Sequence, residues 1–427
     1  MWGGGNFVTM NKVLPGVYSN ISTSGGSSAS ISDRGLVAIG LPGLTWGPDG
    51  TVFKMTASEF YTKGQRIFGV NPMDESMKGV RDFFQYATVG YFYKLGTATK
   101  AGNTFADAKY GGTLGNNIQM VVSANADDES KWDVETYVGS KLIDTAVGVS
   151  STDDMVDNDH VIWKDGVAFT VGTVLMSGGA DGTADATAYS AFWTAIEPYE
   201  ELHAIGCLAT DESIKNAFVS FIKRLVTEKG YTVQGVVYDM KADNENIVNV
   251  KNSVDLVYWA SGAVGGCAVN KSMTGKTYNG EFAIPAEYTQ SELEQAIKGG
   301  EWTLHKVGDD LKVLKDINSL TSFTIDKNES LAYNQVVRAT NTFLYAIKQS
   351  FQTIDLGNTP NDASGRASVQ SRIVENGLRL LDVGAFSEFV DSETIVEAGT
   401  DRASIVVTTA FTPATVMEKM YLNMVVN

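Results

Sequence analysis

Residues 203–238 read HAIGCLATDESIKNAFVSFIKRLVTEKGYTVQGVVY, a strand, a helix and a second strand in close succession. Residues 203–208 form an apolar run that predicts a buried strand, and residues 231–238 predict another. Between them, residues 211–229 predict an amphipathic helix that ends at Gly230. Its apolar face is formed by Ile214, Phe218, Phe221, Ile222 and Leu225. This order of elements is typical of a layered α/β domain with a largely parallel sheet.

The same alternation continues downstream. Residues 247–250 predict a strand, and residues 254–269 predict a Gly-rich helix. A Thr-x-x-Glu capping box at residues 289–292 begins a further helix, which ends at Gly299. We therefore assign residues 99–316 to one central α/β domain.

Upstream of the opening stretch the pattern changes to short strands. Residues 117–123 predict a strand, and residues 131–149 predict a β-hairpin that turns at a Gly-Ser pair. Residues 33–98 contain short strands separated by turn clusters such as Gly-Pro-Asp-Gly, and we assign them to a small β-rich N-terminal domain.

The C-terminal part, residues 317–412, predicts an α+β domain. A sequence at residues 326–329 resembles a capping box and predicts the start of a long helix, and residues 362–381 predict a second helix. Residues 385–390 and 404–411 predict strands. The fold class expected from the sequence is thus a mixture of α/β and α+β domains in one chain.

Both ends of the chain read as extended segments outside these domains. Residues 1–32 combine a Gly run, an apolar extended stretch and a Ser/Gly-rich linker, and residues 413–427 place apolar side chains on one face with a period of two. The residues predicted to make inter-subunit contacts are Phe7, Val8, Met10, Val13, Leu14, Val17, Tyr18, Met420, Leu422, Met424 and Val426. Such segments need a sheet edge to pair with, and that edge can belong to the same chain or to another copy. Pairing with another copy and pairing inside the chain are both open at this point.

The composition argues against several classes of function. The chain has 427 residues and a formal net charge of −17, which argues against a nucleic-acid-binding surface. It shows no apolar run of about 18 residues and no secretory signal, so we expect neither membrane insertion nor secretion. Cys207 and Cys267 lie in apolar or Gly-rich segments and predict buried free thiols, as suits a reducing cytoplasm.

Residues that could carry chemistry are few and scattered. His160, His203 and His305 are far apart and lack the spacing of metal ligands. The Gly-rich turn at residues 177–182 lacks the Lys-Ser/Thr pair that holds phosphate, and Ser272 has no local triad signature. We therefore predict no catalytic residues, no cofactor and no metal.

The order of several motifs resembles that of contractile tail sheath proteins, of the branch found in Gram-positive myophages, prophages and phage-tail-like bacteriocins. The motifs lie at residues 3–18, 34–35, 46–47, 68–69, 100–101, 110–118, 175–182, 318–321, 334–338 and 360–366. The likeness extends over nearly the whole chain. One departure lies at residues 353–359, where the family often has a Tyr-Ile-Gly-Lys-like stretch and this chain reads TIDLGNT.

The resemblance implies a structural protein of a contractile injection apparatus. It implies a central domain similar to subtilisin but without catalytic residues, and stacked hexameric rings around an inner tail tube. The arms of neighbouring copies are expected to add strands to a C-terminal sheet, and contraction drives the tube through a target cell envelope. The implied partners are further copies, the tube, the baseplate and the tail terminator, in a virion tail or a phage-tail-like particle assembled in the bacterial cytoplasm.

Other classes of protein remain alternatives at this point. A type VI-like secretion sheath is the nearer one, although such sheaths usually consist of two different chains. A secreted surface-lattice protein would also polymerise through strands, but it would carry a secretion signal. A degenerate hydrolase depends only on the α/β centre and Ser272.

Overall fold

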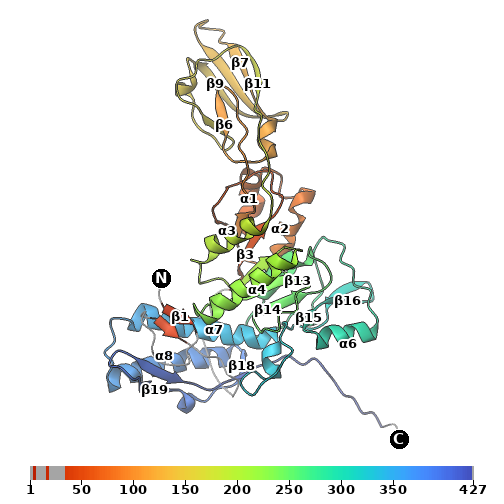
Figure 1. The fold of residues 1–427 in the computed structure, drawn as a ribbon, viewed down its shortest axis with the longest axis vertical. Coiled ribbons are helices and arrows are strands. Elements are labelled where there is room, and N and C mark those ends of the chain that lie inside the picture. Colours follow the sequence, from red (N-terminus) through yellow and green to blue (C-terminus); the bar gives the residue numbers. More distant parts are fainter. Residues whose placement is uncertain (1–2, 6–15, 19–33, 426–427) are drawn as a thin grey trace. The chain divides into compact units, whose positions relative to one another are not determined.

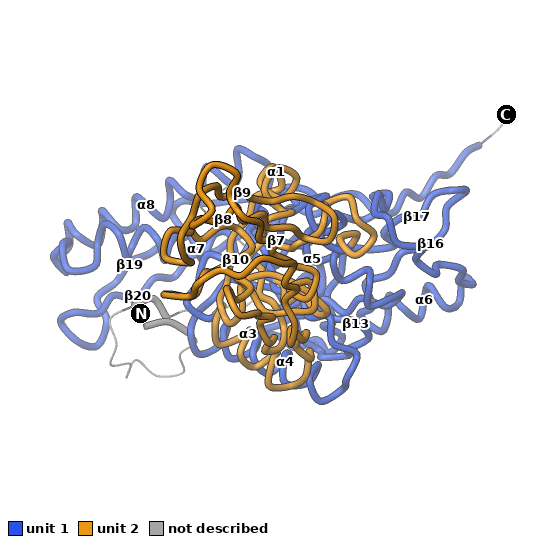
Figure 2. Tube along the Cα trace, turned by 90° about the horizontal axis from the view of Figure 1, so that it is seen from above, with its two compact units in different colours: residues 1–38, 79–89, 197–427 blue, residues 39–78, 90–196 orange. Residues whose placement is uncertain are grey.

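The computed structural model describes residues 3–5, 16–18 and 34–425, and for the first two of these ranges it describes the backbone alone. Figure 1 shows the fold as a ribbon, and Figure 2 colours the two compact units into which the chain divides. Unit 1 comprises residues 1–38, 79–89 and 197–427, and unit 2 comprises residues 39–78 and 90–196. Three elements run across the divisions: β3 (Leu36–Leu41), α2 (Lys78–Phe83) and β5 (Val89–Lys94).

Unit 1 is built on the parallel strands predicted from the opening stretch. β12 (Ala204–Cys207) pairs with β13 (Gln234–Tyr238), β13 with β14 (Ile247–Val250), and β14 with β15 (Glu301–Trp302). The helices that connect them are α4 (Glu212–Thr227), α5 (Leu256–Gly266) and α6 (Gln290–Lys298). A hairpin of β16 (Leu304–Val307) and β17 (Asp310–Val313) follows. The parallel α/β arrangement of this region is confirmed.

Local sequence explains why α4 forms and where it packs. Asp211 caps the helix by accepting hydrogen bonds from the amides of Ser213 and Ile214. The helix buries its apolar face, and it can approach β13 closely because position 235 is glycine. A Cβ at Gly235 would lie only 2.7 Å from Cγ1 of Ile222. The strand and the helix are therefore matched to each other.

The C-terminal half of unit 1 packs two long helices against short strands. The helices are α7 (Asn334–Ser350), which continues as the π-helical turn η5 (Phe351–Asp355), and α8 (Ala363–Asp382). The strands are β18 (Phe386–Glu388) with β21 (Thr412–Pro413), and β19 (Ile395–Ala398) with β20 (Ile405–Thr408). Short 3₁₀ helices occur at η4 (Glu329–Ala332) and η6 (Asp391–Glu393). The buried core between them includes Ala339, Phe343, Ala346, Val369, Ile373, Leu380, Phe386 and Val396.

The predicted start of the long helix at residues 326–329 is wrong. Asn328 caps only the short turn η4, and α7 begins at Asn334. The side chain of Asn334 donates to Asp316 Oδ1 at 3.0 Å and to the carbonyl of Ile317 at 2.9 Å. Contacts with a distant loop, and not the local capping sequence, therefore place the first turn of α7.

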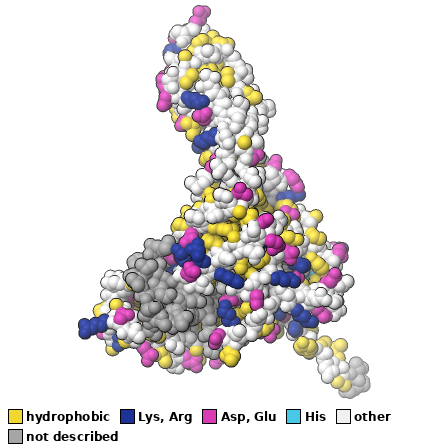
Figure 3. Space-filling view, in the orientation of Figure 1, with side chains coloured by type: hydrophobic (Ala, Val, Ile, Leu, Met, Phe, Trp, Pro, Cys, Tyr) yellow, Lys and Arg dark blue, Asp and Glu magenta, His cyan; other side chains and the backbone are white. Residues whose placement is uncertain are grey.

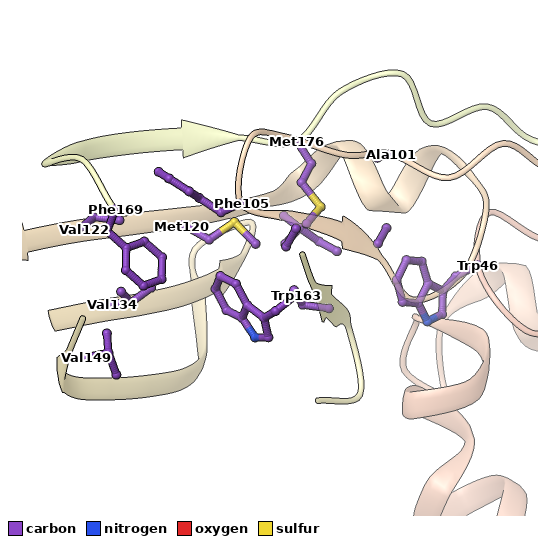
Figure 4. Packing of buried hydrophobic residues seen from close by; sticks show 14 residues of the cluster. Trp46, Ala101, Phe105, Met120, Val122, Val134, Val149, Trp163, Phe169 and Met176 are labelled. Carbon is purple, nitrogen blue, oxygen red and sulfur yellow. The ribbon is translucent and has the colours of Figure 1, made fainter. Parts of the chain in front are cut away.

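Unit 2 contains a β-sandwich and the elements that flank it. A four-stranded antiparallel sheet has the order β11 (Gly172–Leu175), β7 (Ile118–Ala124), β8 (Trp132–Val138), β9 (Lys141–Val149), which confirms the predicted hairpin. A second pair is formed by β6 (Ala106–Ala108) and β10 (Val161–Trp163). Flanking elements are β4 (Phe53–Thr56), α1 (Ala57–Phe68), η1 (Glu75–Met77), η2 (Thr113–Asn117), η3 (Thr152–Asp154) and α3 (Ala186–Ile196). Figure 4 shows the core of the sandwich, in which Phe105, Met120, Val134, Trp163 and Phe169 are buried.

The Gly-rich turn at residues 177–182 is held by hydrogen bonds to another segment of unit 2. Asn116 donates to the carbonyl of Gly179 at 2.9 Å and accepts from its amide at 2.8 Å. Asp181 accepts hydrogen bonds from the amide and the hydroxyl of Thr113. Two segments that the sequence shows as separate motifs thus lie against each other.

Replacing Asn116 with alanine is expected to destabilise unit 2 by about 1–3 kcal/mol, because both hydrogen bonds to Gly179 are lost at once. Urea unfolding followed by tryptophan fluorescence measures the change. Gln119→Ala is the matched control, since the Gln119 amide makes only a long bond of 3.5 Å to the carbonyl of Gly139. An Asn116 variant as stable as the control would contradict this role.

Candidate inter-subunit surface

The C-terminal tail is the most exposed apolar part of the described chain. After β21, residues 414–425 carry neither helix nor strand. Met417 is fully exposed, and Met420, Leu422 and Met424 are 85%, 66% and 78% exposed. Figure 3 shows hydrophobic side chains along the tail. Large contiguous apolar surface of this kind marks an interaction site.

The beginning of the tail is nevertheless attached to unit 1. The amide of Ala414 donates to the carbonyl of Ala385 at 2.9 Å, and the amide of Val416 donates to Gln335 Oε1 at 3.2 Å. Glu418 accepts a hydrogen bond of 2.9 Å from the hydroxyl of Thr274, and its other oxygen lies 3.7 Å from Nζ of Lys315. The tail therefore leaves the body directly after Glu418.

The N-terminal segment is described only in part. β1 (Gly3–Gly5) pairs in parallel with β2 (Gly16–Tyr18), with Gly3 opposite Gly16 and Gly5 opposite Tyr18. β1 lies near α4, and β2 lies near η5. This pairing differs from the single extended arm expected from the sequence.

Arg34 holds the point at which the described chain resumes after residue 33. Its Nε donates to the carbonyl of Cys267 at 3.0 Å, and its Nη2 donates to the carbonyl of Val264 at 3.3 Å. These carbonyls lie at the C-terminal end of α5, where a cation is favoured. Burial, and next the like charge of Arg338, lower the pKa of Arg34 to about 9.

Of the residues predicted for inter-subunit contact, Met420, Leu422 and Met424 lie together on the exposed tail. Val17 and Tyr18 lie in β2. Phe7, Val8, Met10, Val13, Leu14 and Val426 lie outside the described residues. The part they play in assembly stays a prediction.

The two-stranded sheets of unit 1 provide edges that an added strand could use. β19 and β20 pair with each other from Ile395 opposite Thr408 to Ala398 opposite Ile405. Within the described chain this sheet has only these two strands, so the outer side of each has no strand partner. Val396 is buried on the helical core, whereas Ile395 is 48% exposed. An edge with its inner face already anchored is a suitable template for β-augmentation.

Among the side chains considered for chemistry, His203 and Ser272 have structural partners. His203 Nδ1 accepts a hydrogen bond of 3.2 Å from the amide of Leu36, and burial lowers its pKa well below the ordinary value. Ser272 donates to the hydroxyl of Thr274 at 3.1 Å and accepts from the Thr274 amide. Cys207 and Cys267 are buried free thiols, as predicted, and burial raises the pKa of Cys207 to about 12.

Within the ranges that the structure describes, no cluster of His, Cys, Asp or Glu could hold a metal ion. Among the same residues, no helix is both long and apolar enough to cross a membrane.

A β-sandwich, a parallel α/β region and a C-terminal α+β region define the class of protein. The family model "Phage tail sheath protein beta-sandwich domain" matches residues 94–181, the central-domain model matches residues 182–319, and the C-terminal-domain model matches residues 326–427. The chain therefore belongs to the phage tail sheath protein family and is a structural protein of a tail sheath. The resemblance seen in the sequence is confirmed.

Particular relatives are similar over their full length. The phage-like element PBSX protein XkdK of Bacillus subtilis (strain 168) is 27% identical, over 99% of this chain and 100% of the relative. The solved sheath tail protein of Desulfitobacterium hafniense is 28% identical, with a TM-score of 0.81, over 95% of this chain and 99% of that one. The helical sheath of the anti-feeding prophage in its contracted state shares the fold, with a TM-score of 0.56 and 13% identity, over 97% of this chain and 99% of that one.

Proposed function

We propose that this sheath protein polymerises as stacked hexameric rings around an inner tail tube, and that its terminal segments donate strands to neighbouring subunits. The observation that carries the proposal is the apolar tail beyond Glu418, which has no strand partner within the described residues. Each backbone hydrogen bond of a donated strand contributes about 0.5–1.5 kcal/mol, and burial of the apolar side chains adds to this. Two such strands per subunit would hold a ring to its neighbours.

We place the acceptor on the β19–β20 sheet. Neither strand of this sheet has a second strand partner within the described chain, and its inner face already packs on the helical core. An incoming strand would therefore bind to an ordered surface, which costs less entropy than forming a new sheet from two mobile segments. The N-terminal segment, residues 1–18, would take one side and the tail, residues 413–427, the other. In the free subunit the β1–β2 pair would be a local substitute for that partner.

Connected arms explain how a polymer can change shape without dissociating. The bodies of the subunits would shift and repack while the donated strands keep neighbouring subunits joined. The energy of contraction would be the difference between two sets of interfaces, so that no nucleotide, cofactor or metal would be needed. The contracted structure of the anti-feeding prophage sheath, which shares this fold, supports such a cycle.

The domain plan proposed for this function follows the sequence. It has an arm and linker at residues 1–32, a β-rich domain at 33–98, a central domain at 99–316, a C-terminal domain at 317–412 and a tail strand at 413–427. We also propose that the central domain is a subtilisin-like scaffold without catalytic residues. The parallel strands β12–β15 and the use of Ser272 as a hydrogen-bond partner of Thr274 support this view.

The proposed surroundings are those of a virion tail or a phage-tail-like particle. The tube, the baseplate and the tail terminator would be partners, with assembly in the bacterial cytoplasm before any contact with the target envelope. The net charge of −17 would keep free subunits apart by repulsion until assembly begins.

Electron microscopy of the purified chain at increasing concentration tests this function. The expected result is striated hollow cylinders, which become longer as the concentration rises. Flat lattices would indicate a surface-layer protein, and a chain that stays monomeric at every concentration and ionic strength, even with purified tail tubes present, would contradict the proposal.

A further inference from the structure

A series of hydrogen bonds, buried in its middle part, connects the attachment points of the two terminal segments. It begins at Arg34, whose Nη1 donates to the hydroxyl of Thr342 at 3.3 Å. That hydroxyl donates to the carbonyl of Arg338 at 2.8 Å, one turn earlier on α7. Thr342 and Arg338 are both buried. The root of the N-terminal segment is thus bonded to the middle of α7.

The series continues through an ion pair in the interior of unit 1. Nη2 of Arg338 lies 3.2 Å from Oδ2 of Asp316, and both side chains are at most 1% exposed. The other oxygen of Asp316 accepts from Asn334, and Oδ2 also accepts from the amide of Met273 at 3.0 Å. Asp316 therefore has partners on α7 and on the loop that follows α5.

Thr274 completes the connection to the tail. Its hydroxyl accepts from the amide of Asp316 at 2.9 Å and from the hydroxyl of Ser272 at 3.1 Å, and it donates to Glu418 at 2.9 Å. One donor and two acceptor sites are all that a hydroxyl offers, so Thr274 is fully used. Glu418 is the last residue of the tail held by the body.

Stability alone does not account for this arrangement. Burying an ion pair costs hydration free energy, which the attraction between the two charges barely offsets. A protein with apolar side chains in place of the pair is often as stable. Here Nε of Arg338 is also buried without a hydrogen-bond partner in the described part of the chain. The other polar groups of this network have hydrogen-bond partners. The main effect of such a network is to fix one geometry of the residues that it joins, and its contribution to stability is secondary.

We propose that the series Arg34–Thr342–Arg338–Asp316–Thr274–Glu418 couples the two terminal segments, so that loosening the attachment of one arm also loosens the attachment of the other. This inference builds on the proposed strand donation. Load applied to an arm in a shortening sheath would reach the other arm through these residues. Arg34 and Thr274 are then positioning residues for the arms.

Hydrogen exchange on the monomer tests the coupling, with Thr274→Val and Arg34→Met as the variants. Thr274→Val keeps the shape of the side chain and removes the hydroxyl that joins Asp316 to Glu418. The expected result is faster exchange at residues 414–418 and also at residues 34–36, by about fivefold or more. Arg34→Met is expected to give the reciprocal effect at residues 414–418.

Two controls separate coupling from general loss of stability. Ile214→Ala, on α4, removes apolar burial in the same unit from a side chain outside this series. Exposed Thr353→Val removes a hydroxyl that bonds only to the carbonyl of Gln349. Neither control should speed up hydrogen exchange at both termini together.

Two results would refute the coupling. One is that each test variant speeds up exchange only at the terminus that it contacts, and the other is that Ile214→Ala reproduces the same pattern. Because the monomer is measured, a wild-type chain that builds no cylinders would count against strand donation and not against this result.

Discussion

A chain that lacks residues 1–15 is expected to remain a folded monomer and to lose the ability to build long sheath. The deleted range contains β1, and Arg34, whose side chain donates to carbonyls at the end of α5, lies outside it. We therefore expect the free energy of unfolding to fall by less than about 1 kcal/mol, as is usual when a chain is shortened at its end. Assembly should fall much further, because every subunit loses one of its two links to neighbouring copies.

Sedimentation and electron microscopy measure this loss, and urea unfolding measures the stability of the monomer. The matched control keeps the length of the segment and replaces residues 6–15 with a Gly/Ser sequence of equal length. If the apolar side chains of the arm make the contacts, the control fails to assemble as the deletion does. Cylinders of wild-type length from the deleted chain would contradict the linking role of the N-terminal segment.

Replacing both Leu422 and Met424 with aspartate is expected to block polymerisation while the monomer stays as stable as the wild type. Both side chains are largely exposed, so charge at these positions costs little in the free subunit. In a donated strand the same positions would face an apolar surface, where an unpaired carboxylate is strongly unfavourable. The substitution therefore acts on assembly and not on folding.

The control for added negative charge is Val156→Asp with Val171→Asp, at two exposed valines of unit 2. This variant has the same net charge and is expected to polymerise. Circular dichroism and thermal unfolding monitor the monomers. A large loss of monomer stability in the Leu422/Met424 variant would mean that the tail pairs within its own chain.

Sequence patterns predicted the elements whose signals are local. The cap at Asp211 and the apolar face of α4 lie within a few turns of each other, and the hairpin of β8 and β9 is marked by its own turn. The capping box of α6 at Thr289 and Glu292 is also confirmed. In each case the residues that determine the element are close in sequence, so a pattern can reveal them.

Elements determined by distant contacts were predicted less well. The start of α7 depends on Asn334 reaching Asp316, which no capping pattern reveals. The ion pair of Asp316 and Arg338 was not predicted either, since one acid and one base far apart carry no local signal. The motifs at residues 318–321 and 334–338 resemble those of the family, and the structure shows that each contributes a buried asparagine: Asn318 donates to the carbonyl of Leu331, and Asn334 donates to the carbonyl of Ile317. The hydrogen bonds that these residues make can be identified only from the structure.

The extended termini are a third case. Alternation of apolar residues predicted a strand at residues 420–426, and the described tail has no strand within the chain. A strand requires a partner, and the partner proposed here belongs to another molecule. No pattern within one sequence can identify which edge of which copy will accept it.

A cryo-EM map of the assembled sheath, detailed enough to trace residues 3–18 and 414–425, tests the central claim most directly. The account predicts continuous density for both segments that crosses to other subunits and lies beside β19 or β20 of those subunits. Density in which both segments return to the body of their own subunit and touch no other copy would contradict it.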